Sequence, residues 1–177
     1  MSTDGFSKIA VIGAGTMGSG IAAQIANAGH EVTLLDLPAR EGADKSPAEM
    51  AIDRLMASDP PQLMHKRNAG RIVTGTISDD FGKLADCDWI IEAVVERLDI
   101  KKDLYARLDA TIGPDCIVSS NTSTIPISLL VEDMPTAFRK RFAITHYFNP
   151  VRYMRLLELV RGTDTGQAVI DRLADFN

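Results

Sequence analysis

The chain has 177 residues, of which 45% are hydrophobic and 24% are charged, as expected for a globular protein with one sizeable core. Its formal net charge of −5 argues against a surface that binds nucleic acid or anionic membranes. No apolar run reaches the roughly 18 residues that suggest a membrane span, and the first residues lack the pattern of a signal peptide. We therefore expect a cytoplasmic protein without nucleic-acid or membrane partners.

A βαβ unit is predicted at the start of the chain. Residues 8–12 are an apolar run that ends in glycines, which is typical of a buried parallel strand. Residues 16–28 place small and apolar side chains at helical spacing and stop at Gly29, a favoured C-cap. Residues 31–35 are apolar and β-branched and lead into Asp36, as a second strand would.

Further helices and strands then alternate along the chain. Ser46, Pro47 and Glu49 have the spacing of a capping box, which predicts a helix that ends near Ala57. The remaining expected elements are helical segments at residues 62–69 and 98–108 and strands at residues 71–74, 89–94 and 116–119. Cys87 and Cys116 lack metal-ligand spacing, so we expect buried free thiols in a reducing compartment.

The pattern changes near the end of the chain. Residues 142–145 and 154–160 look like consecutive strands joined by a turn at Asn149-Pro150, which predicts an antiparallel edge. A last helix is expected from residue 163 to residue 176, and its lack of a cap before Asn177 suggests a piece of a longer enzyme. The predicted fold class is α/β, a doubly wound Rossmann-type sheet that is mostly parallel with an antiparallel edge near the C-terminus.

The turn between the first strand and helix has the sequence Gly13-Ala14-Gly15-Thr16-Met17-Gly18. In G-x-G-x-x-G, the glycines permit a tight turn, close approach of a pyrophosphate and close packing of helix on strand. The helix N-terminus offers free N–H groups to the phosphates. A tight turn without a ligand is the alternative. Asp36 favours the dinucleotide, because a carboxylate about 20 residues on can hydrogen-bond a ribose.

Asp36 also bears on the choice of cofactor. A carboxylate beside the ribose 2′-hydroxyl would repel the extra phosphate of NADP, and no arginine directly follows it. Arg40 could approach only if the loop folded back. NAD is the expected cofactor.

His146 and Glu158 are candidates for a general base and its orienting partner. They lie twelve residues apart with a turn between them, so two antiparallel strands could bring both side chains to one end of the sheet. Histidine can take up a proton near neutral pH, and a nearby carboxylate orients it and stabilises the cation. The alternative, a strand-end polar residue beside a solvated edge charge, is equally compatible with the spacing.

Two further polar groups have open interpretations. Residues 119–124, Ser-Ser-Asn-Thr-Ser-Thr, follow a parallel strand at the edge where ligands bind, but capping of a helix near Ile127 is the favoured interpretation from sequence alone. Glu96 and Lys101 could contact a ligand, although an ordinary solvated helix face is favoured without further information.

Four segments in order resemble the NAD-binding domain of L-3-hydroxyacyl-CoA dehydrogenases. They are Ala10-Val11-Ile12-Gly13-Ala14-Gly15-Thr16-Met17-Gly18, Ile91-Glu92-Ala93-Val94-Val95-Glu96, Ser120-Asn121-Thr122-Ser123 and His146-Tyr147-Phe148-Asn149-Pro150. The resemblance covers nearly the whole chain, and residues 152–162 are most similar to long multifunctional members. It implies NAD-dependent oxidation of (3S)-3-hydroxyacyl-CoA to 3-oxoacyl-CoA in fatty-acid β-oxidation.

The resemblance also implies roles for individual residues. His146 would be the catalytic base with Glu158 as its partner, and Ser123 would bind both substrate and cofactor. The residues implied to bind NAD are Gly13, Gly15, Thr16, Met17, Gly18, Asp36, Glu96, Lys101, Ser123 and Asn149. No metal ligands are implied.

The resemblance departs from the family pattern in two places. The family's second, all-helical domain supplies most of the dimer contact, closes over the acyl-CoA and adds a catalytic asparagine, and residues 1–177 correspond only to the NAD-binding domain. We therefore expect the full-length protein to be oligomeric and these residues alone to be nearly inactive. Residues 39–70 match the family's CoA-contacting arm poorly, so no CoA residues are assigned. A dehydrogenase of a free hydroxy acid and an inert NAD-binding module remain as alternatives.

Overall fold

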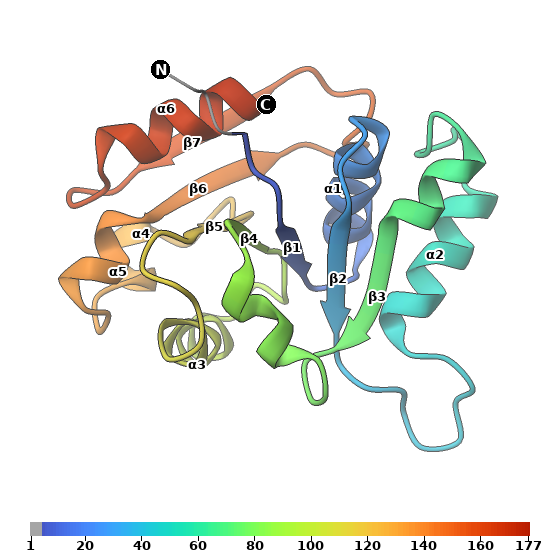
Figure 1. Cartoon of the computed structure of the whole chain (residues 1–177), viewed down its shortest axis with the longest axis horizontal. Coiled ribbons are helices and arrows are strands. Elements are labelled where there is room, and N and C mark those ends of the chain that lie inside the picture. The colour runs from blue at the N-terminus through green and yellow to red at the C-terminus, as the bar shows by residue number, and fades with distance from the viewer. Residues whose placement is uncertain (1–4) are drawn as a thin grey trace.

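The computed structural model describes residues 5–177, which form a seven-stranded sheet between two layers of helices (Figure 1). The strands are β1 (Ile9–Ile12), β2 (Val32–Asp36), β3 (Ile72–Thr76), β4 (Trp89–Glu92), β5 (Ile117–Ser120), β6 (Phe142–Tyr147) and β7 (Leu157–Arg161). Their order is β3-β2-β1-β4-β5-β6-β7, and only β6 and β7 pair antiparallel. The predicted doubly wound sheet with an antiparallel edge is confirmed.

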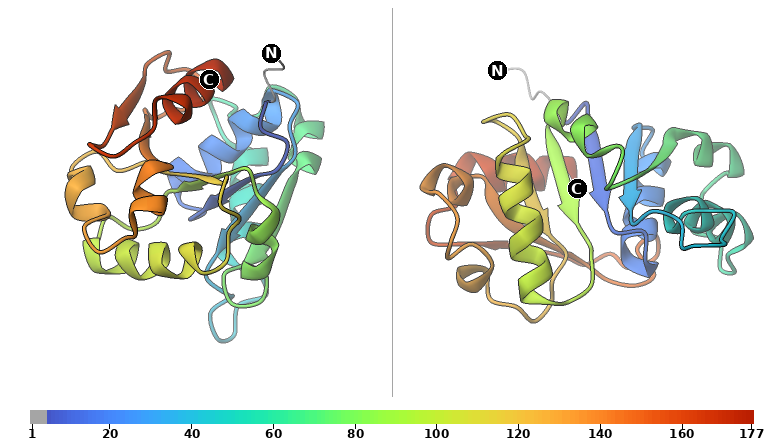
Figure 2. Two further views of the ribbon diagram at one scale, coloured as in Figure 1. Left: turned by 60° about the vertical axis from the view of Figure 1, so that its left-hand side comes forward. Right: turned by 90° about the horizontal axis from the view of Figure 1, so that it is seen from below.

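Helices cover both faces of the sheet. They are α1 (Thr16–Asn27), α2 (Pro47–Ala57), α3 (Leu98–Asp109), α4 (Ile127–Leu130), α5 (Thr136–Lys140) and α6 (Gln167–Phe176), with 3₁₀ helices η1 (Lys66–Arg71) and η2 (Phe81–Asp86). One core holds buried side chains of α1, α2 and α6, and the other those of η2, α3, α4 and α5. Figure 2 shows α6 and α3 on opposite sides of the sheet. The strands between them are therefore buried on both faces, which explains their continuous apolar runs.

The capping box at Ser46 is confirmed. Its Oγ accepts a hydrogen bond from the Glu49 backbone N–H, and Glu49 Oε2 accepts one from the Ser46 backbone N–H at 2.8 Å. These bonds satisfy two donors that would otherwise be orphaned at the start of α2, which ends at Ala57 as predicted. The hydrogen bonds that the Ser46 backbone N–H and hydroxyl donate to the Glu49 carboxylate lower the pKa of that carboxyl from its ordinary value.

Several predicted boundaries are wrong, each for a local reason. The helical segment expected at residues 62–69 is the 3₁₀ helix Lys66–Arg71, with His65 as its cap. β7 begins three residues later than expected, because the backbone N–H groups of Tyr153 and Met154 close a turn onto the Pro150 carbonyl. α6 begins four residues later than expected, at Gln167, because the Thr165 side chain first binds Phe142 and Gly162. The hydrophobic pattern of the sequence does not predict η2 or α5.

No helix within residues 5–177 combines the length and the apolar character that crossing a membrane requires.

Candidate functional site

Two cavities open at the carboxyl edge of the sheet, where the strand order reverses between β1 and β4. Dinucleotides bind across this switch point in doubly wound folds. The first cavity, of about 470 Å³, is lined by Gly13, Gly15 and Asp36 together with apolar side chains of α3 and its neighbours. The second, of about 450 Å³, is lined by residues that include Met17, Ser123, His146 and Asn149. We call them the β2-side cavity and the His146 cavity.

The loop between β1 and α1 has the geometry expected of a phosphate cradle. Gly13 has φ +105°, a left-handed conformation that favours glycine. A Cβ on Gly18 would lie 1.8 Å from the Gly13 carbonyl oxygen, so only glycine lets the helix pack this closely on the loop. A Cβ on Gly15 would meet no atom within 4 Å, and no side chain caps α1. Open space and free N–H groups therefore face the position that a pyrophosphate requires.

Asp36 is the last residue of β2 and lies beside this loop. Its carboxylate accepts hydrogen bonds from the Ala14 backbone N–H and, at 2.6 Å, from the Leu37 backbone N–H. The same carboxylate lines the β2-side cavity. It therefore lies beside the loop, at the end of the second strand, where the sequence pattern predicts a ribose-binding carboxylate.

The structure brings His146 and Glu158 together. They are directly opposed across the antiparallel pair of β6 and β7, and His146 Nδ1 lies 2.8 Å from Glu158 Oε2. The His146 side chain is 17% exposed and that of Glu158 is 52% exposed, so the ring lies in the cavity wall with the carboxylate toward solvent. With Nδ1 engaged, Nε2 is the ring nitrogen left to act on a ligand.

Lys101 is not on a solvated helix face, which corrects the interpretation favoured by the sequence. Its side chain is 1% exposed, and its Nζ lies 2.7 Å from Glu92 Oε1 and 3.2 Å from Glu96 Oε2. Partial burial of Glu96 would raise the pKa of its carboxyl, but a hydrogen bond from Thr122 and the charge of Lys101 outweigh that effect and lower it. Glu96 and Lys101 both line the His146 cavity.

The polar loop after β5 does not cap a helix, so that interpretation was wrong as well. No side chain caps α4, which begins after Pro126. Instead, the Thr122 and Thr124 hydroxyls donate to Glu96, and the exposed Ser123 is left to line the cavity. The threonine hydroxyls of the loop therefore fix the position of the Glu96 carboxylate in the cavity wall.

Sequence reasoning missed Glu92 and Asn121. The apolar pattern places Glu92 inside a strand at residues 89–94, whereas β4 ends at Glu92, whose carboxylate accepts a hydrogen bond from the Val94 backbone N–H at 2.8 Å. Asn121 lines the His146 cavity and accepts a hydrogen bond from the Tyr147 backbone N–H at 2.9 Å. A carboxylate inside an otherwise apolar buried strand was the available signal for Glu92.

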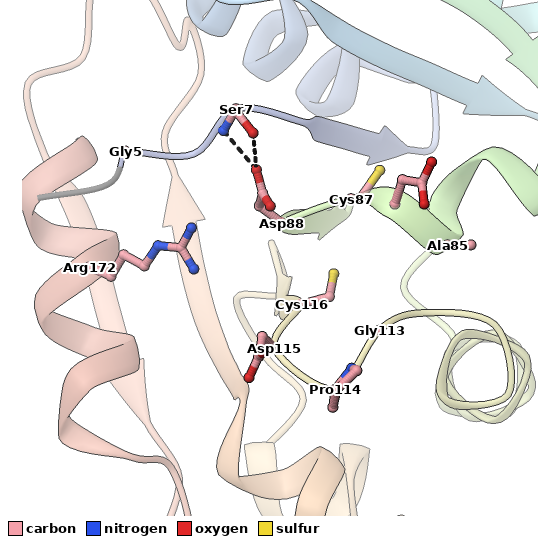
Figure 3. A pocket seen from close by; sticks show the side chains of 11 residues that line it. Gly5, Ser7, Ala85, Cys87, Asp88, Gly113, Pro114, Asp115, Cys116 and Arg172 are labelled. Atoms are coloured by element: carbon pink, nitrogen blue, oxygen red, sulfur yellow. Dashed lines mark hydrogen bonds between the residues drawn. The ribbon is translucent and has the colours of Figure 1, made fainter. Parts of the chain in front are cut away.

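A third hollow, of about 670 Å³, lies at the opposite edge of the sheet (Figure 3). Ser7 donates to the Asp88 carboxylate there, and Arg172 of α6 points into the hollow. Its larger volume does not make it the functional site, because the phosphate loop and the His146 pair lie at the other edge.

Cys87 and Cys116 are free and buried, and burial raises the thiol pKa to about 11 and about 12 respectively. The expectation of buried free thiols is confirmed.

Comparisons with known proteins agree with this geometry. Residues 8–177 match the family model described as "3-hydroxyacyl-CoA dehydrogenase, NAD binding domain". A Rickettsia felis protein named as a fatty acid oxidation complex trifunctional enzyme is 42% identical over 96% of this chain and 24% of its own length. A Deinococcus radiodurans protein named as a 3-hydroxyacyl-CoA dehydrogenase is 40% identical over 96% of this chain and 49% of its own length.

A crystal structure of 3-hydroxybutyryl-CoA dehydrogenase from Escherichia coli K12 superposes with a TM-score of 0.82 at 34% identity, over 96% of this chain and 35% of that one. The chain thus spans about a quarter to a half of the length of these proteins. The fold, the phosphate loop and the match over residues 8–177 lead to one assignment. The chain belongs to the 3-hydroxyacyl-CoA dehydrogenase family, of which it forms an NAD-binding domain.

Proposed function

We propose that this domain serves the oxidation of (3S)-3-hydroxyacyl-CoA to 3-oxoacyl-CoA, with His146 as the general base. The observation that supports this most is the 2.8 Å contact between His146 Nδ1 and Glu158 Oε2 in the wall of a cavity beside the phosphate loop. A base at the nicotinamide end of a dinucleotide site is the combination that alcohol oxidation requires.

The side chains of the His146 cavity divide the proton transfer and the binding of substrate between them. NAD⁺, held by the phosphate loop and Asp36, would supply the acceptor for the hydride that leaves C3 of the substrate. His146 Nε2 takes the hydroxyl proton, while Glu158 accepts a hydrogen bond from Nδ1–H, fixes the ring orientation and offsets the positive charge that the ring gains. Ser123 holds the substrate oxygen.

We propose that the NAD contacts follow the two cavities. The loop from Gly13 to Gly18, including Thr16 and Met17, binds the pyrophosphate, and Asp36 binds the adenosine ribose. Glu96, Lys101, Ser123 and Asn149 contact the nicotinamide half from the wall of the His146 cavity. This division is consistent with the strand order β3-β2-β1-β4, which reverses direction between β1 and β4. In doubly wound folds the two halves of a dinucleotide lie on either side of this switch point.

We propose that the acyl-CoA is enclosed by a second, helical domain of the kind that the resemblance implies. The relatives are two to four times longer than the segment that matches, so there is room for such a domain in them. Oligomerisation through that domain and low turnover by residues 1–177 alone are parts of the same proposal. Enclosure contributes because holding reactants in a near-attack geometry is worth about 7–11 kcal/mol in favourable cases.

Asp36→Ala should reduce the preference for NADH over NADPH. The substitution removes both the ribose hydrogen bond and the repulsion of the 2′-phosphate. The affinity for NADH should therefore fall, and the affinity for NADPH should rise relative to it. A hydrogen bond to a charged group contributes on the order of 1.5–3 kcal/mol, or roughly tenfold to a hundredfold in affinity. Fluorescence titration with both cofactors measures this, and equal affinities in the unmodified chain would contradict the role of Asp36. Asp79→Ala, at another acidic residue near β3, is a matched control that should keep the preference.

The substrate class is tested on the natural polypeptide that contains these residues. With NAD⁺ present, we expect NADH to form from (3S)-3-hydroxybutyryl-CoA far faster than from free 3-hydroxybutyrate. Faster oxidation of the free acid would instead support a hydroxy-acid dehydrogenase. NAD⁺ binding without oxidation of either compound would support an inert module.

A further inference from the structure

Glu92 is a fully buried carboxylate directly beneath the wall of the His146 cavity. Its exposure is 0%, and its Oε1 accepts hydrogen bonds from Lys101 Nζ at 2.7 Å and the Val94 backbone N–H at 2.8 Å. Its Oε2 accepts hydrogen bonds from the Tyr105 and Ser120 hydroxyls, both at 2.6 Å. Both oxygens of this carboxylate therefore have two hydrogen-bond donors each, as a buried carboxylate requires.

The ion pair that Glu92 forms is shared with Glu96. Lys101 lies between the two carboxylates, at 2.7 Å from Glu92 and 3.2 Å from Glu96. Two carboxylates and one ammonium carry a net charge of −1. Glu96 and Lys101 line the cavity, whereas Glu92 lies behind them. We call Glu92, Lys101 and Glu96 the buried charge triad.

NAD⁺ and NADH differ by one positive charge, which lies on the nicotinamide ring. We propose that Glu92, through the net charge of the buried charge triad, makes the site favour NAD⁺ over NADH. The positive charge of Lys101 and the negative charge of Glu96 alone would give the cavity wall no net charge. The carboxylate of Glu92 adds a second negative charge and makes the net charge −1. Low exposure strengthens the effect, because charges away from water are screened less. Glu92 thus acts as a specificity-determining residue without touching the cofactor.

This inference rests on the proposed function in one respect, namely that the nicotinamide half occupies the His146 cavity. Its consequence for the reaction follows from the charge. A site that holds NAD⁺ more tightly and NADH less tightly favours loading of the oxidised cofactor and release of the reduced one, which is the direction of alcohol oxidation.

The test compares affinities for NAD⁺ and NADH in the chain and its Glu92→Gln variant by calorimetric titration. Glutamine keeps the shape of the side chain but makes the triad neutral. The ratio of NAD⁺ to NADH affinity should fall by roughly fivefold to thirtyfold, the effect of one charge about 8–17 Å from the nicotinamide ring at an effective dielectric constant of about 20. The ratio is informative because general damage to the site weakens both forms alike.

Two further variants separate charge from structure. Tyr105→Phe removes a hydrogen bond to Glu92 and leaves the charge at −1, so the ratio should not change. Ser120→Ala removes another hydrogen bond to Glu92 and also leaves the charge at −1, so the ratio should again match that of the unmodified chain. Thermal unfolding by circular dichroism verifies that each variant is folded.

Two results would overturn the inference. One is equal weakening of NAD⁺ and NADH binding in Glu92→Gln, and the other is a fall of the ratio of the same size in Tyr105→Phe or Ser120→Ala, in which the charge is unchanged. If the unmodified chain bound neither form, the proposed function itself would fail, and this inference with it.

Discussion

His146→Gln should lower the rate of alcohol oxidation by roughly 10²–10⁴, the usual contribution of a positioned acid–base group. Glutamine can occupy the same part of the wall but cannot accept the hydroxyl proton. NAD⁺ affinity should change little, because the phosphate loop and Asp36 are untouched. Steady-state NADH formation by the natural polypeptide measures the rate, and calorimetry measures the affinity.

The same experiment extends to the partner of the ring. Glu158→Gln should also slow oxidation, by less than His146→Gln, since the amide still meets the ring but cannot balance its positive charge. His65→Gln, at an exposed histidine outside both cavities, should leave the rate unchanged. Near-normal turnover of His146→Gln would mean that another group is the base.

Two alanine substitutions in the phosphate loop should both abolish tight NAD binding, for different reasons. At Gly18 a Cβ would lie 1.8 Å from the Gly13 carbonyl oxygen, so the loop and α1 must separate and the fold itself should lose stability, by about 1–3 kcal/mol or more. At Gly15 a Cβ meets no protein atom within 4 Å. Gly15→Ala should therefore remain as stable as the unmodified chain while its methyl group obstructs the pyrophosphate.

Gly15→Ala should lower the affinity for NAD⁺ by about a hundredfold or more. Each hydrogen bond from a loop N–H group to the charged pyrophosphate contributes on the order of 1.5–3 kcal/mol. Calorimetric titration with NAD⁺ gives the affinity, and thermal unfolding without cofactor gives the stability. Gly82→Ala is a matched control, because a Cβ there also meets nothing within 4 Å and the residue lines neither cavity at the carboxyl edge. Unchanged NAD⁺ affinity in Gly15→Ala would place the pyrophosphate elsewhere.

The sequence predicted best those features that depend on local backbone chemistry. Gly13 and Gly18 follow from the geometry of the turn, and the capping box at Ser46 follows from the donors that a helix N-terminus must satisfy. The pairing of His146 with Glu158 could also be predicted from the sequence. In two antiparallel strands joined by a turn, side chains alternate between the faces, so the turn determines which residues face each other. Spacing alone still left a solvated edge charge as an equal alternative.

The remaining parts of the site depend on contacts between distant segments. The sequence pattern around Lys101 is typical of a solvated helix face. Its ammonium group is nevertheless buried, because the carboxylate of Glu92 on β4 pairs with it. The hydroxyl groups after β5 match a helix cap in sequence, yet in space Glu96 is their partner. Side-chain partners across elements override such local preferences, and one sequence read alone carries no direct signal of them.

The proposed binding mode places the nicotinamide half of NAD beside His146 and the adenosine half beside Asp36. Nuclear magnetic resonance of the chain tests this with NAD⁺ and with ADP-ribose, which lacks only the nicotinamide. The chain has 3 histidines, so the His146→Gln spectrum assigns the ring signals. We predict that NAD⁺ shifts the His146 ring signals strongly and ADP-ribose does so weakly, while both ligands shift the backbone amide signals of Gly15 and Asp36. Equal shifts of the His146 signals by the two ligands, or none with NAD⁺, would contradict the account.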